Sequence, residues 1–125
     1  MREIKDFKPF IPSNDYDVSK SFYKCMGFDI NWDSGEVCEI DTKFGYRFLL
    51  LPKNHNNYSE SLMLHFWVNS AQEWYDHFTK IKLTEKFPGT KVAEPELMPW
   101  GLIVTHVWDP AGTLLHFAED PNEKE

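Results

Sequence analysis

The sequence contains no long hydrophobic run. Its longest apolar stretch, "LMLHFWV" at residues 62–68, is far shorter than the roughly 20 residues that a membrane-spanning helix needs. The N-terminal "MREIKDFKPF" also lacks the apolar core of a signal peptide. We therefore expect a cytoplasmic protein that does not associate with a membrane.

Cysteine and glycine are scarce. The two cysteines, Cys25 and Cys38, lie in apolar surroundings, so we expect buried free thiols and no disulfide framework. The six glycines are scattered and form neither a GxGxxG nor a Walker phosphate loop. A GxSxG nucleophile elbow is missing as well, so no familiar catalytic motif assigns an active site.

Basic residues are fewer than acidic ones: 13 lysines and arginines against 20 aspartates and glutamates give a formal net charge of -7 at pH 7. An acidic chain is a poor nucleic-acid binder and modestly favours cationic partners, although acidity also serves solubility alone. Aromatic residues, in contrast, make up 16% of the 125 residues, which is more than a core of this size usually needs. The composition predicts a single globular domain over residues 1–125, with part of its aromatic content on a binding surface.

The first half of the chain reads as strand, helix and three strands. A strand pattern at "FKPFIP" precedes a helix from about Asp15, in which Val18, Phe22 and Met26 recur at helical spacing before Gly27. Extended stretches then follow at 28–33, 36–41 and 46–51, separated by glycines.

The second half repeats this order after a polar loop at 52–61. The strand at 62–68 leads into a helix whose start is marked by Ser70 and Glu73, a capping box, and whose apolar face carries Trp74, Phe78 and Ile81. Further strands are predicted at 91–98, 102–108 and 113–118. The repeat indicates two related modules, one at about 7–51 and the other at about 62–119, that form a curved sheet around a cleft.

Strand alternation predicts which side chains face that cleft. If the aliphatic positions of the 62–68 strand pack on the helices, His65 and Trp67 point into the cleft. In the last strand, Leu115 and Phe117 are then core residues, and Leu114 and His116 lie on the cleft side.

Nearly the whole chain resembles the vicinal oxygen chelate superfamily. The resemblance rests on "SNDYDVSKSFYKCMGF" at the start of the first half and on "DPAGTLLHF" near the end of the second. Within that superfamily, "LHFWVNSAQEWY" and the series "PWG", "DPAG" and "LHFAED" are most similar to bleomycin-resistance proteins. The resemblance implies an α+β fold of two paired βαβββ modules forming a curved mixed sheet around a cleft. It also implies a homodimer in which both chains bound each cleft.

The resemblance also provides a test for metal. Metal-dependent members carry their ligands at the positions that Lys8, Met63 and His116 occupy here. A charged lysine cannot ligate, and a thioether is too soft for the divalent ions of such sites, so we expect no metal and no cofactor. The alternative is a non-standard site in which His65, His106 and His116 converge, as in a metal-dependent enzyme of the glyoxalase or dioxygenase type.

The resemblance further implies a ligand site. Trp32 and Trp100 take positions whose aromatic counterparts stack on bleomycin, while Asn31 replaces an acid and His65 replaces a tryptophan. The predicted ligand-binding residues are Asn31, Trp32, His65, Trp67, Trp100 and His116. An alternative for Trp32 is a strand residue at a dimer contact.

Together these features predict a bleomycin-resistance-like protein that sequesters a small planar, cationic ligand in an aromatic cleft without catalysis. Two alternatives stay open: the metal-dependent enzyme and a dimeric binding module for a cellular metabolite. The N-terminal "MREIKDF" is expected to reach the second chain as an arm.

Overall fold

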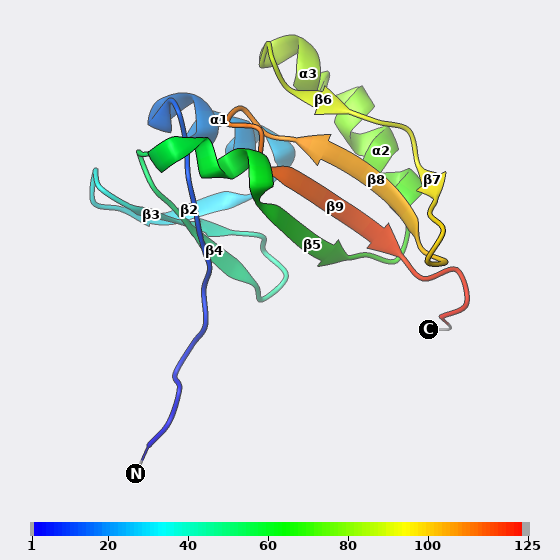
Figure 1. The fold of residues 1–125 in the computed structure, drawn as a ribbon, viewed down its shortest axis with the longest axis horizontal. Coiled ribbons are helices and arrows are strands. Elements are labelled where there is room, and N and C mark those ends of the chain that lie inside the picture. The colour runs from blue at the N-terminus through cyan, green and yellow to red at the C-terminus, as the bar shows by residue number, and fades with distance from the viewer. Residues whose placement is uncertain (1, 124–125) are drawn as a thin grey trace.

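The computed structural model describes residues 2–123, and each of its two halves begins with a strand, continues with helix and ends in further strands (Figure 1). The first half comprises β1 (Phe10–Ile11), α1 (Tyr16–Met26), β2 (Asp29–Asp33), β3 (Cys38–Asp41) and β4 (Arg47–Leu50). A kinked 3₁₀ segment, η1 (His55–Ser61), separates it from the second half. The second half comprises β5 (Met63–Trp67), α2 (Ala71–Lys80), α3 (Leu83–Lys86), β6 (Lys91–Val92), β7 (Glu96–Leu97), β8 (Ile103–Trp108) and β9 (Leu114–Glu119).

Each half builds its own mixed sheet. We call them sheet A, with strand order β1-β4-β3-β2, and sheet B, with order β5-β9-β8-β6 and β7 paired to β8. In both sheets the first strand of the module pairs in parallel with the last, β1 with β4 and β5 with β9, and the other pairs are antiparallel. The predicted α+β fold of two βαβββ modules is confirmed, with two separate sheets in place of one continuous sheet.

Helix α1 begins and ends where its sequence signals place it. The Asp15 side chain accepts a hydrogen bond from the Val18 N–H at the N-terminus, and Gly27 closes the C-terminus with a φ of 116° that favours glycine. The predicted apolar face was partly wrong, because Val18 is 39% exposed whereas Tyr23 is fully buried. The buried stripe runs through Phe22, Tyr23 and Met26, so the helix is rotated away from Val18.

The second module departs from prediction in its connections. Helix α2 starts as predicted, with the Ser70 Oγ accepting from the Glu73 N–H. The predicted strand at 91–98 is split into β6 and β7, and Pro95, which cannot donate to a sheet, lies in the gap. Helix α3 and segment η1 were not predicted, since neither carries a long periodic pattern.

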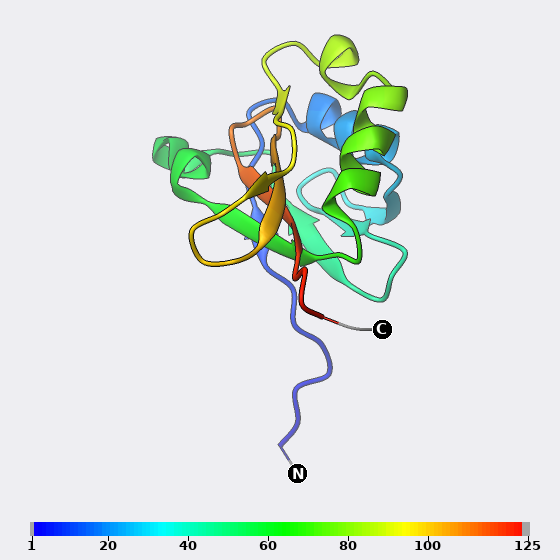
Figure 2. The ribbon, with the colours of Figure 1, turned by 90° about the vertical axis from the view of Figure 1, so that its right-hand side faces the viewer.

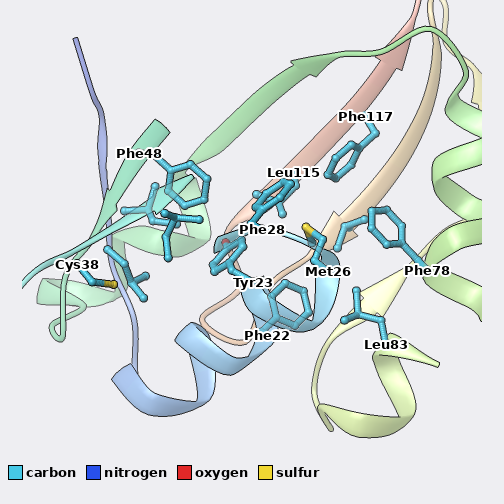
Figure 3. Packing of buried hydrophobic residues seen from close by; sticks show 14 residues of the cluster. Phe22, Tyr23, Met26, Phe28, Cys38, Phe48, Phe78, Leu83, Leu115 and Phe117 are labelled. Carbon is cyan, nitrogen blue, oxygen red and sulfur yellow. The ribbon is translucent and has the colours of Figure 1, made fainter. Parts of the chain in front are cut away.

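Residues of both modules share one hydrophobic core. Figure 2 shows α1 and α2 on the same side of the strands, and their buried faces meet the inner faces of both sheets. At its centre Phe117 stacks on Phe66 with a centroid distance of 4.8 Å, and Trp74 lies 4.9 Å from Phe117. Figure 3 shows the packed cluster, which includes Phe22, Tyr23, Met26, Phe28, Cys38, Phe48, Phe78, Leu83, Leu115 and Phe117. Cys25 and Cys38 are free thiols, as predicted, although Cys25 is only partly buried.

One buried polar group ties the two modules together. The Tyr23 hydroxyl of α1 donates a 2.6 Å hydrogen bond to Asp109 Oδ2 in the turn between β8 and β9. The other carboxylate oxygen of Asp109 accepts from the backbone N–H groups of Ala111 and Thr113. Asp109 therefore shapes the turn and links it to α1.

The N-terminal segment extends away from this body (Figure 1). Ile4 is 87% exposed and Phe7 is 83% exposed. The segment first meets sheet A near Asp6, whose carboxylate accepts a hydrogen bond from Arg47. Within residues 2–123, no helix is long and apolar enough to cross a membrane.

Candidate functional site

Three histidines form a row across the face of sheet B that is turned away from the helices. His65 of β5 pairs with His116 of β9, which pairs with His106 of β8, so the three lie side by side on adjacent strands. The ring centroids of His106 and His116 are 4.7 Å apart, and those of His65 and His116 are 6.3 Å apart. We call these three residues the histidine row.

Tryptophans flank the histidine row. The Trp67 ring lies edge-on to His65 with a centroid distance of 4.7 Å, and Trp108 stacks near His106 at 6.0 Å. Leu64 and Phe66 of β5, and Val68 directly after it, pack on the core, as the alternation predicted. The row and its tryptophans thus give sheet B a flat aromatic face.

Two members of the histidine row, His106 and His116, have a lowered pKa. Burial lowers the pKa of His116, and the neighbouring His106 and His65 lower it further. Burial also lowers the pKa of His106, an effect that Glu96 opposes in part. The Nε2 atom of His116 is buried and has no hydrogen-bond partner among the residues described. His106 and His116 are therefore held toward the uncharged form, and His116 keeps one ring nitrogen free to form a hydrogen bond.

We expect this row to make the protein acid-sensitive. As the pH falls below 6.5, the ordinary histidine value, the unfolded chain takes up protons that folded His106 and His116 still refuse, so the free energy of unfolding decreases. Above pH 6.5 this loss should be absent. Urea unfolding at pH 7.5 and 5.5 measures it, and a His106→Gln, His116→Gln double variant should show a smaller difference between the two pH values. An unchanged difference in that variant would contradict the assignment.

A β-bulge shapes the corresponding face of sheet A. The register between β2 and β3 shifts between Ile30 and Trp32, which leaves Asn31 as the extra residue. The Trp32 position pairs with Glu39, and the Asn31 amide donates to Glu39 Oε2 at 2.8 Å and to Asp41 Oδ2 at 3.1 Å. The bulge therefore directs Asn31 and Trp32 to the same face, where the amide contacts two acids.

Charged groups on this face are largely paired with one another. Lys8 donates to Glu39, and Arg47 donates to Asp6 at 2.8 Å. The hydrogen bond from Lys8 holds the pKa of Glu39 below its ordinary value, with a further contribution from Asn31. This face of sheet A is consequently polar, in contrast to the aromatic face of sheet B.

A cavity of about 690 Å³ lies between the two sheets. One wall comes from the hairpin between β3 and β4, including Phe44 and Tyr46, and the other from β5 and the start of α2. His65 and Trp67 line it, together with Glu73 and Trp74. We call this space the intersheet cavity.

The structure brings some predicted site residues together and keeps others apart. His65, Trp67 and His116 share one face of sheet B, and Asn31 and Trp32 share one face of sheet A. Trp100 is 59% exposed in the turn between β7 and β8. Within residues 2–123 of one chain, no cavity contains all six of the predicted residues.

The three positions that the sequence resemblance matched to metal ligands do not suit a metal here. Lys8 is engaged by Glu39, and Met63 is a thioether that is 62% exposed. His116 is thus the one nitrogen ligand of the three positions that is free to bind. Among the residues described, no group of three histidine, cysteine or acidic side chains is arranged to hold an ion.

Sequence analysis missed several residues of the intersheet cavity. Phe44 and Tyr46 flank Gly45, a residue that the sequence analysis used only to separate two predicted strands. Both aromatic side chains are strongly exposed, at 69% and 75%. Two large exposed aromatics beside a hairpin glycine are a signal that the sequence did contain. Trp74 was assigned to the core, which it does contact, but it lines the cavity as well.

Known structures resemble this chain over nearly its full length. A bleomycin-binding protein complexed with bleomycin matches with a TM-score of 0.79 and 22% identity, covering 96% of this chain and 100% of the other. The bleomycin-binding protein of Streptomyces verticillus, complexed with copper(II)-bleomycin, matches with a TM-score of 0.73 and 16% identity over 94% and 97%. Lactoylglutathione lyase from Agrobacterium tumefaciens matches with a TM-score of 0.67 and 15% identity over 94% and 96%.

Sequence comparison alone does not place the chain: no protein-family model matches it, and no curated protein matches it significantly. The similar structures include both binding proteins and an enzyme. At sequence identities of 15–22%, the similarity shows a shared fold and does not show a shared function. The chain therefore has the fold of the vicinal oxygen chelate superfamily, the fold of bleomycin-binding proteins and glyoxalases that its sequence predicted.

Proposed function

We propose that this protein binds a small planar, cationic ligand in an aromatic cleft and sequesters it without changing it chemically. The observation that carries the proposal is the intersheet cavity, whose walls hold Phe44, Tyr46, Trp67 and Trp74. Flat aromatic walls favour planar ligands by stacking and cations through the ring quadrupole. A volume of about 690 Å³ is within the range of small-molecule sites.

Two further points support binding over chemistry. The residues at the superfamily's metal positions are unsuited to a divalent ion, for the reasons given above. The resembling structures also include proteins that bind bleomycin. Under this proposal protection depends on affinity and on the number of protein molecules, as expected for resistance to a bleomycin-like antibiotic. A cellular metabolite with the same flat, cationic chemistry would use the same walls.

We also propose that the working unit is a homodimer. The exposed faces of the two sheets carry Trp32, Trp67 and, in the adjoining turn, Trp100, and the N-terminal segment presents Ile4 and Phe7. Exposed apolar groups of this number are characteristic of an interface. In a dimer, the sheet A face of one protomer would meet the sheet B face of its partner and bring Asn31, Trp32, Trp100 and His116 to the ligand.

The test is a titration of the protein with bleomycin in EDTA, followed by tryptophan fluorescence. We expect saturable quenching at about one drug per chain and an affinity at least about tenfold lower in Trp67→Ala, because the truncation removes a stacking wall. Trp100→Ala should also bind more weakly.

The control is Tyr58→Phe, which changes an aromatic residue of η1 that lines neither cavity and lies on neither sheet, and keeps an aromatic ring. It should bind the drug as tightly as the unaltered protein does. A flat titration of the unaltered protein would rule out bleomycin itself. Saturable binding that Trp67→Ala and Trp100→Ala leave unchanged would refute the site.

A further inference from the structure

The first turn of α2 places Glu73, an exposed acidic residue, at the edge of the aromatic walls of the intersheet cavity. Glu73 lines this cavity and also a second, smaller one of about 290 Å³ beside it. Phe44 and Trp74 line both cavities too, and their rings meet edge to face with a centroid distance of 6.4 Å. Glu73 therefore lies where the two cavities adjoin, next to an aromatic pair.

The lysine and arginine side chains that line the two cavities form ion pairs with acids other than Glu73. Arg47, on the wall of the larger cavity, donates to Asp6 at 2.8 Å and lies 3.9 Å from Glu39. Lys43, on the wall of the smaller one, is 3.6 Å from Asp29. Within residues 2–123, Glu73 has no ion-pair partner within 4.0 Å. The cavity wall thus retains one uncompensated negative charge.

The position of Glu73 in the helix does not account for this arrangement by itself. An acid in the first turn of a helix is stabilising, and in a full capping box its side chain reaches back to the N–H of the cap residue. Here the bond from the Glu73 N–H to the Ser70 Oγ forms, at 3.1 Å. Glu73 also borders both cavities, and an acidic residue next to aromatic rings favours a positively charged partner.

We infer that the intersheet cavity binds an organic cation with a flat aromatic body, and that Glu73 makes the cavity selective for the positive charge. The flat body lies against Phe44, Trp67 and Trp74, and the positive group faces the Glu73 carboxylate. This inference builds on the proposed function, because it concerns the same cavity, and it adds the residue that separates cations from neutral molecules of the same shape.

The experiment compares two dyes of nearly identical shape, 9-aminoacridine, which is protonated at neutral pH, and acridine, which is neutral there. Binding is followed by the indole N–H signals of Trp67 and Trp74 in NMR spectra. The unaltered protein should prefer the cation. In Glu73→Gln, affinity for the cation should fall about fivefold, as expected for a partly exposed ion pair, while affinity for acridine should not change.

Glutamine at this position is a suitable replacement because it can still serve in a capping box, so the helix should stay intact. The matched control is Glu85→Gln, which neutralises an acid in the first turn of α3, away from both cavities. It should keep the preference for the cation. If Glu73→Gln keeps the preference as well, or if neither dye shifts the two indole signals, the inference is wrong.

Failure of this inference is distinguishable from failure of the proposed function. Bleomycin that binds equally well to the unaltered protein and to Glu73→Gln would leave sequestration in place and remove Glu73 from the site. A Glu73-dependent preference for 9-aminoacridine without any binding of bleomycin would do the reverse. The cavity would then be a cation site that serves another ligand.

Discussion

Asp109→Ala should lower the free energy of unfolding by about 3–5 kcal/mol, because it leaves buried donors without an acceptor. The Tyr23 hydroxyl and the backbone N–H groups of Ala111 and Thr113 all donate to this carboxylate, which is 1% exposed. Urea unfolding followed by tryptophan fluorescence at neutral pH measures the loss.

Asp120→Ala is the matched control. Asp120 also accepts a bond from a backbone N–H, that of Asn122, but in an exposed turn near the C-terminus. Its loss should change the free energy of unfolding by no more than about 0.5 kcal/mol. An Asp109→Ala protein as stable as the Asp120→Ala protein would show that the buried carboxylate does not hold the two modules together.

Phe117→Ala should destabilise the protein by a similar amount, about 3–5 kcal/mol, because it leaves a void at the centre of the core. Phe117 is 1% exposed and contacts Phe66, Trp74 and Phe78 through its ring. It also lines the intersheet cavity, so the void should merge with that space. Denaturant unfolding gives the free-energy loss.

Phe44→Ala provides the comparison for this effect. The Phe44 ring is 69% exposed, so its removal should cost about 0.5 kcal/mol or less although the same side-chain atoms are deleted. Equal losses in the two variants would mean that the core does not depend on the stacked rings around Phe117.

Much of this architecture could be predicted because its signals are local. Asp15 and Gly27 mark the ends of α1, Ser70 marks the start of α2, and alternation along β5 separates the core side from the other. The strand, helix and strands that the sequence pattern predicts in each half then indicated the fold. The exposure of Val18 was not predictable from spacing, because tertiary packing against both sheets decides how α1 is rotated.

The candidate site was less predictable because it depends on long-range placement. Alternation put His65 and His116 on one side of their strands, but the direct alignment of His106 with His116 follows from the strand register. The bulge at Asn31 breaks alternation, so simple counting could not show that Asn31 and Trp32 share a face. The sequence indicated Glu73 only as part of a helix-capping signal. Its neighbours in the cavity come from a hairpin that is distant in sequence, so its position in the cavity could not be predicted.

The parallel strand pairs also determine the order in which the chain can fold. The helices and hairpins join residues that are close in sequence, whereas β1 must find β4 and β5 must find β9 across about 40 to 50 residues. These closures come late, since the loop entropy is lost before the contacts form. Strand β5 is then held along five paired positions but β1 along two, so of these two parallel strands β1 should open more readily when the folded chain fluctuates.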